Sequence, residues 1–481
     1  MKILKHSFYN LLGLGLPLVV AVFTIPVLIK ELGEARFGLL TLIWAVVSYF
    51  GLFDLGLGRA LTQQLAVVLG KNNNEEVGPL VGTATLIMAA LGIFAGILMA
   101  AAAPWGVGLI NAVPDKQEAI RAVYAMALAM PFIVLTSGFR GILEASHAFG
   151  LVNLIRMPMG LFTFLGPLVV VIYGQARLDW IAAVLVIGRI VACIVHGYYA
   201  WTELPHYKGR MGWHRELLKP LCISGGWLTV SNIISPFMGY VDRFVIGAIV
   251  SAGAVAYYAT PLELAAKLWI VPGALTAVLF PAFATQIIRQ DKQTWALFKK
   301  AVYWLFAALL PVTVTLALFA KEILSLWISQ EFAAHSAMLL QIFAVGIFVN
   351  CMAHVPFTLI QSAGAARRTA LIHTAELPLF LAALWMLTSA YGVQGAAVAW
   401  LLRMVLDTLL MFAVSHQLLG RSSKDFFSRK TCGLIFLTLI CFTGTFFEHV
   451  AIRVVWIAAS LGIGLITLYV TYEQSSKKLT S

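Results

Sequence analysis

Twelve ionisable side chains lie in or beside long apolar stretches of this sequence, where they could bind an anion or exchange a small cation. A charged side chain at the centre of a bilayer costs roughly 2.5–3.5 kcal/mol. Because of this cost, we predict that they face one another or a watery cavity. The seven basic members, predicted as substrate contacts in the cavity, are Arg59, Arg140, Arg156, Arg189, Arg243, Lys267 and Arg403, and the acidic members are Asp54, Asp242, Glu263, Glu376 and Asp407.

Three of the arginines, Arg59, Arg140 and Arg156, are predicted near the cytoplasmic ends of the second, fourth and fifth membrane spans. A guanidinium can form two parallel, charge-assisted hydrogen bonds with a phosphate group. Three of them in the same half of the chain therefore suit a pyrophosphate that enters from the cytoplasm. The alternative interpretation is that each long side chain only extends to the lipid headgroups.

Two pairs of opposite charge have the spacing of one helical turn. Glu263 and Lys267 are four residues apart, and so are Arg403 and Asp407, so each pair can make contact on one helix face. We predict Arg403 and Asp407 as a structural ion pair. The alternative for both pairs is a role in the cavity.

Three acidic residues, Asp242, Glu263 and Glu376, are candidates for coupling transport to an ion. Protonation or Na⁺ binding at one of them would change the charge inside the membrane and could bias the conformational cycle. Asp242 and its neighbour Arg243 lie about 100° apart around a helix, so they cannot neutralise each other. Each of these two side chains therefore needs another partner or a substrate.

The remaining reactive side chains fit helix packing better than catalysis. His196, His354 and His373 lack the spacing of a ligand set and are interpreted as hydrogen-bonded packing residues, and the five cysteines contain no CxxC pair. The glycine-rich stretch 54–59 lacks the Lys-Ser/Thr pair of a phosphate-binding P-loop. We therefore predict no metal site, no cofactor and no enzymatic activity.

The elements that carry these charges must be membrane helices, because the composition excludes a soluble multidomain enzyme. Of the 481 residues, 61% are hydrophobic and 11% are charged, against roughly 45–50% and 25% in soluble domains. The net charge of +12 does not indicate a nucleic-acid partner, because no polar domain is present to carry a binding face.

The apolar stretches predict an all-α protein with about fourteen membrane-spanning helices of about 20 residues each. Lys and Arg concentrate in alternate loops, nineteen on the side of the amino terminus and seven on the other, so both termini are predicted to be cytoplasmic. The predicted spans are 8–29, 37–58, 80–103, 120–143, 154–174, 180–201, 222–250, 257–285, 300–320, 338–360, 371–391, 396–417, 431–447 and 452–472.

A weak internal repeat relates each of several spans to the span six places later. The aligned blocks are 29–37 with 249–257, 151–158 with 371–378, and 182–191 with 396–405. Because six is even, the halves are predicted to be parallel repeats around a central cavity. The predicted units are residues 1–205, residues 206–425, and two additional helices with a cytoplasmic tail in 426–481.

Several motifs resemble those of the polysaccharide and O-antigen flippases, a family of the multidrug/oligosaccharidyl-lipid/polysaccharide exporter superfamily. They are Pro-Val-Leu-Ile-Lys-Glu-Leu-Gly at 26–33 before Phe37-Gly38, Asp-Leu-Gly-Leu-Gly-Arg at 54–59, and Tyr-Val-Asp-Arg-Phe-Val-Ile-Gly at 240–247. The resemblance implies a bacterial inner-membrane protein that moves an undecaprenyl-pyrophosphate-linked oligosaccharide to the periplasmic leaflet by alternating access. It further implies membrane lipids and polysaccharide polymerase machinery as partners.

Two other functions stay open at this point. Lipid II flippases have the same number of spans, and a membrane-embedded polysaccharide polymerase or glycosyltransferase is the alternative from another class. The absence of a long outer loop in the predicted topology argues against the polymerase. A multidrug extruder of the superfamily is disfavoured, because such proteins have twelve spans and use acidic residues to recognise cations.

Overall fold

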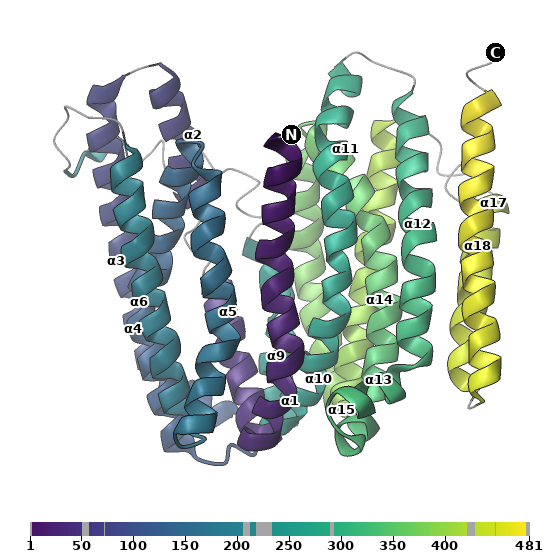
Figure 1. The fold of residues 1–481 in the computed structure, drawn as a ribbon, viewed down its shortest axis with the longest axis horizontal. Coiled ribbons are helices and arrows are strands. Elements are labelled where there is room, and N and C mark those ends of the chain that lie inside the picture. Colours follow the sequence, from purple (N-terminus) through teal and green to yellow (C-terminus); the bar gives the residue numbers. More distant parts are fainter. Residues whose placement is uncertain are drawn as a thin grey trace. The chain divides into compact units, whose positions relative to one another are not determined.

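The computed structural model describes residues 2–50, 57–71, 73–204, 212–217, 233–288, 293–420, 429–447 and 449–477. Within these ranges the chain is almost entirely helical and contains no β-strand (Figure 1). The helices are α1 Lys2–Phe50, α2 Leu57–Gly70, α3 Asn74–Leu109, α4 Lys116–Ala145, α5 Phe149–Tyr173, α6 Leu178–Glu203, α9 Val241–Ile249, α10 Ala252–Ala266, α11 Ile270–Ile288, α12 Thr294–Leu318, α13 Ala320–Trp327, α14 Gln330–Ser362, α15 Ala366–Leu418, α17 Arg429–Thr443 and α18 Val450–Lys477.

The predicted all-α membrane class is confirmed. In the described part of the chain, ten helical segments are long and apolar enough to cross a bilayer, and α17 is a shorter apolar helix. Of the ten, α15 contains two predicted spans, and α1 contains the first predicted span and residues 37–50 of the second. Residues 222–232 of the predicted span 222–250 lie outside the described residues, and so does Asp54.

Both of these long helices bend at a glycine. With a rise of 1.5 Å per residue, the 49 residues of α1 and the 53 of α15 would reach about 74 and 80 Å if straight, more than twice the bilayer core. The bends lie at Gly33 (φ 73°) and Gly392 (φ 58°), in the left-handed region that glycine tolerates without a steric penalty. Each glycine therefore separates two spans that would otherwise form one helix.

The chain forms two compact units, Met1–Ala256 and Tyr257–Ser481, which divide within α10. In the first unit, α5 lies alongside both arms of α1. Its Gly160 faces Pro17 of the first arm, and its Phe164 ring packs edge-on against Trp44 of the second arm, with 5.4 Å between the ring centroids. The predicted division into repeats at residues 205 and 425 stays a prediction, as does the central cavity.

One ion-pair cluster, here called the loop cluster, joins the α1 bend to the starts of α4 and α6. Arg36 Nη2 lies 2.9 Å from Glu118 Oε2, and Glu118 also accepts a hydrogen bond from the Leu178 backbone N–H. Asp179 accepts hydrogen bonds from Arg121 Nε at 2.9 Å and Arg177 Nη2 at 2.6 Å. Arg36, Arg121 and Arg177 lie in or beside the predicted loops that follow the first, third and fifth spans. These loops are all predicted on the non-cytoplasmic side.

Asp115 caps the first turn of α4 beside this cluster. Its carboxylate accepts hydrogen bonds from the backbone N–H groups of Glu118 and Gln117. These hydrogen bonds, with that of Glu118 the strongest influence, lower the pKa of the Asp115 carboxyl below its usual value. The cap therefore satisfies two of the backbone donors that a helix start leaves without partners.

Residues 34–38 of α1 and 252–253 of α10, in or beside two segments that the internal repeat aligns, pack against each other within the first unit. A Cβ added to Gly38 would overlap the carbonyl group of Ala252, so the α1 and α10 backbones touch there. Asn111, in the loop between α3 and α4, forms backbone hydrogen bonds with α9 and α10 beside this contact. Its backbone N–H donates to the Gly247 carbonyl at 2.9 Å, and its carbonyl accepts from the Ala252 N–H at 2.9 Å.

Candidate functional site

The predicted basic residues of the first unit occupy several helices. Arg59 on α2, Arg140 on α4 and Arg156 on α5 are all exposed. Arg59 and Arg140 flank a tight helix crossing, where a Cβ on Gly141 would lie 2.7 Å from the carbonyl oxygen of Gly58. The structure therefore brings the backbones of these two arginines together. Their role as phosphate contacts stays a prediction.

Other charges of the first unit are more buried. Arg189 on α6 is half-buried, and Asp242 and Arg243 on α9 are 0% and 4% exposed. The Asp242 carboxylate accepts a hydrogen bond from the Arg243 backbone N–H at 2.8 Å, and the Arg243 guanidinium carbon lies 5.2 Å from the centre of the Tyr240 ring. These contacts place Asp242 against the backbone of its own helix and Arg243 against an aromatic ring.

In the second unit, the predicted contact between Glu263 and Lys267 is confirmed. Lys267 Nζ lies 3.3 Å from Glu263 Oε2, and both side chains are close to half exposed. Lys267 is the first residue of a short 3₁₀ segment, η2 (Lys267–Trp269), which separates α10 from α11. Because the pair is exposed, its contribution to stability is small.

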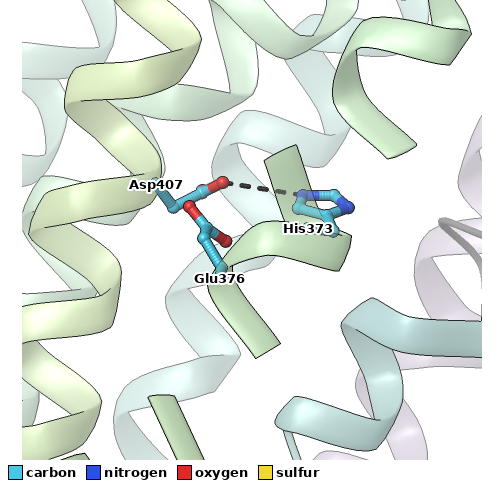
Figure 2. Close-up of side chains that lie close together, drawn as sticks. All are labelled: His373, Glu376 and Asp407. Carbon is cyan, nitrogen blue, oxygen red and sulfur yellow. Dashed lines mark ion pairs between the residues drawn. The ribbon is translucent and has the colours of Figure 1, made fainter. Parts of the chain in front are cut away.

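A buried group of three titratable side chains, here called the carboxylate cluster, consists of His373, Glu376 and Asp407 on α15. Glu376 is sixteen residues before the Gly392 bend and Asp407 fifteen after it, so both lie about 23 Å from the bend along their arms. His373 and Glu376 are three apart and share a face of the first arm. One ligand atom from each residue lies within 4.8 Å of the other two (Figure 2).

Asp407 connects the cluster to neighbouring helices. Its Oδ1 lies 3.6 Å from His373 Nε2, and its Oδ2 accepts from Asn350 Nδ2 on α14 at 3.5 Å. Asn350 Oδ1 in turn accepts from Trp269 Nε1 of η2 at 3.0 Å. The Arg403 guanidinium carbon lies 5.4 Å from the centre of the Phe380 ring. The predicted Arg403–Asp407 ion pair stays a prediction.

In this cluster, the surroundings of Glu376 are the least favourable to a negative charge. The residue is 1% exposed, and neither carboxylate oxygen has a hydrogen-bond partner. If Glu376 and Asp407 were both ionised, they would repel each other by about 3.5 kcal/mol at an effective dielectric constant of about 20. Removal from water disfavours the charged forms further. Binding of a proton at Glu376 would remove this repulsion.

The sequence pattern predicts only part of these groups. His373 was predicted to be a packing residue, and its ring does stack on Phe357 with centroids 6.4 Å apart, but it also lies against Asp407. Its three-residue spacing from Glu376 was the available signal. The contacts of Glu118 with Arg36 and of Asp179 with Arg121 had no signal, because these partners are 82 and 58 residues away in sequence.

Solved structures of transporters share this fold. An inward-facing multidrug resistance MATE family transporter of the MOP superfamily is 14% identical, with a TM-score of 0.72 over 86% of this chain and 94% of that chain. The lipid II flippase MurJ, in an inward closed conformation, is 15% identical, with a TM-score of 0.68 over 99% of this chain and 100% of that chain. The chain therefore has the multi-helix membrane fold of these proteins.

Sequence comparisons identify the family. The family described as polysaccharide biosynthesis protein matches residues 3–286. A provisionally named O-antigen transporter from Shigella flexneri is 31% identical over 417 residues, which are 85% of this chain and 97% of the relative. The uncharacterized membrane protein EpsK from Bacillus subtilis (strain 168) is 19% identical over 78% of this chain and 74% of the relative. The chain belongs to the polysaccharide biosynthesis protein family, as its motifs predicted.

Proposed function

We propose that this protein is a flippase that moves an undecaprenyl-pyrophosphate-linked oligosaccharide from the cytoplasmic to the periplasmic leaflet of the bacterial inner membrane by alternating access. The observation that carries the proposal is the match with the lipid II flippase fold along 99% of this chain and 100% of that chain. The MATE transporter fold matches 86%. Together with the family and the O-antigen transporter relative, this favours a lipid-linked saccharide over a small drug.

The charge distribution supports the same substrate. Seven basic side chains against five acidic ones in or beside the spans favour an anionic cargo such as a lipid pyrophosphate. Arg59 and Arg156 are exposed, and so is Arg140, although its Nε lies 3.7 Å from Glu144 Oε1 one helical turn later. Membrane lipids and polysaccharide polymerase machinery are the partners that this function requires.

Coupling to H⁺ or Na⁺ is part of the proposal, and Glu376 is the preferred coupling residue among the three predicted. Glu263 is half-exposed and paired with Lys267, and Asp242 already accepts a backbone hydrogen bond. Glu376 is buried, and its carboxylate oxygens have no hydrogen-bond partner. A buried carboxylate of this kind has the most to gain from binding a cation.

The proposed orientation is checked by labelling single cysteines in a variant that lacks the five native cysteines. Because basic loops stay in the cytoplasm, Lys116→Cys and Glu331→Cys are expected to react with an impermeant maleimide from outside intact spheroplasts. Lys292→Cys and Lys424→Cys should react only after permeabilisation. The reverse pattern would contradict the assignment of cytoplasmic termini.

The flippase assignment is checked in a strain from which the gene has been deleted. Single lipid-linked saccharide units are expected to accumulate in the inner leaflet, because assembly continues while translocation stops. The measurement is the fraction of units that an impermeant reagent modifies at the periplasmic face, with and without re-expression of the protein. Export of unpolymerised units would instead indicate a polymerase, and accumulation of peptidoglycan precursors would indicate a lipid II flippase. Unchanged distributions would show that the protein does not translocate this lipid.

A further inference from the structure

The membrane segment Ala252–Ile287 contains a break in its α-helical structure. Between α10 and α11, the three residues of η2 form a 3₁₀ turn, and Pro261 and Pro272 lie on either side of it. Each proline removes one backbone donor from the helical ladder. A 3₁₀ stretch inside a long helix often marks a hinge. This segment, here called the η2 hinge, is therefore a point at which the helix can change its bend.

A chain of side-chain hydrogen bonds joins the η2 hinge to the carboxylate cluster. Trp269 Nε1 donates to Asn350 Oδ1 at 3.0 Å, and Asn350 Nδ2 donates to Asp407 Oδ2 at 3.5 Å. An indole N–H can only donate and a carboxylate can only accept, so these two neighbours determine the orientation of the Asn350 amide. A movement of Asp407 would consequently be transmitted to Trp269.

The charged groups around Glu376 come from two helices. Asp407 and Arg403 lie on the second arm of α15, and His373 lies on the first arm with Glu376. From α14, His354 lies within electrostatic range of Asp407. Arg403 also interacts electrostatically with Glu376. The net charge of this buried group changes by one when Glu376 gains or loses a proton.

We propose that the carboxylate cluster binds one exchangeable proton at Glu376. Loss of this proton moves Asp407 and, through Asn350 and Trp269, changes the bend of the η2 hinge. The proton passes between a Glu376 carboxylate oxygen and bulk water, with no redox change. With the proton bound, Glu376 is uncharged and does not repel the Asp407 carboxyl group. Once it leaves, two carboxylates within 4.8 Å repel each other. This inference rests on the proposed function in one respect only, namely that the proton exchange drives transport.

The test uses the purified full-length protein in lipid nanodiscs without substrate. The emission of Trp269 is obtained as the difference between the wild type and Trp269→Phe over a pH titration, because the chain has 13 tryptophans. In parallel, infrared difference spectra follow the C=O stretch of a protonated carboxyl group. We expect one titration step at the same midpoint in both signals for the wild type.

The variants separate proton binding from transmission. Glu376→Gln should abolish both signals. Asn350→Leu should retain the infrared step but lose the Trp269 response, because the hydrogen-bond chain is interrupted. Two controls should leave both signals in place: Glu331→Gln, at the first turn of α14, and Trp304→Phe, an exposed tryptophan of α12.

Several outcomes would overturn the proposal. Persistence of the infrared step in Glu376→Gln would assign the proton to another group, and its loss in Glu263→Gln alone would assign it to the exposed pair. A Trp269 response that survives in Asn350→Leu would refute the relay. Since neither signal requires flipping, a failed titration in a protein that still flips lipid would refute only this site. A normal titration in a protein that does not flip the proposed lipid would refute only the proposed function.

Discussion

Replacing Arg156 by alanine is expected to slow export of the lipid-linked saccharide about 10- to 150-fold. A charge-assisted hydrogen bond to a phosphate contributes roughly 1.5–3 kcal/mol, and each 1.4 kcal/mol corresponds to about tenfold. The same expectation applies to Arg59 and Arg140, which are also exposed and flank the crossing of α2 and α4. The measurement is the rate at which saccharide units reach the periplasmic face, at matched protein levels.

The choice of replacement distinguishes phosphate binding from an extension of the side chain to the headgroups. Lysine keeps the charge but loses the paired donors, so it should restore export only in part. Glutamate should be the most harmful, because it repels a diphosphate. Lys71→Ala removes an exposed charge just after α2 and serves as the matched control, with export unchanged. Normal export by the lysine variants of all three arginines would contradict the phosphate-binding role.

Replacing Gly395 by alanine is expected to destabilise the protein by about 3 kcal/mol or more. The added Cβ would overlap the carbonyl group of Leu387, across the bend of α15. A backbone carbonyl cannot move aside as a flexible side chain can, so the two arms must separate. The separation would also displace Glu376 from Asp407. We expect a large fall in melting temperature and in the fraction of protein that elutes as a monodisperse peak in detergent.

The control for this substitution is Gly106→Ala. Gly106 lies in α3, and its added Cβ would meet nothing within 4 Å. Alanine in a helix is favoured over glycine by about 1 kcal/mol, so this variant should be at least as stable as the wild type. Equal melting temperatures for Gly395→Ala and the wild type would show that the α15 bend tolerates a side chain.

The sequence by itself determined the membrane class, the positions of most spans and the family. Long apolar stretches interrupted by charge carry this information locally, because a span must bury about 20 consecutive residues in lipid. The Glu263–Lys267 contact could also be predicted from local sequence, because the two residues are one helical turn apart. The bends of α1 and α15 follow from the interruptions between spans that the sequence already contained.

Only the tertiary structure decided which distant charges meet. The register between the two arms of α15 brings Asp407 to His373, 34 residues earlier, and the packing of α14 adds Asn350. Likewise, Glu118 meets Arg36 across 82 residues because α1 bends beside the start of α4. These contacts depend on how helices rotate and shift against one another. Hydropathy and spacing within a single helix do not determine which helix faces pack together, because lipid accepts any apolar face.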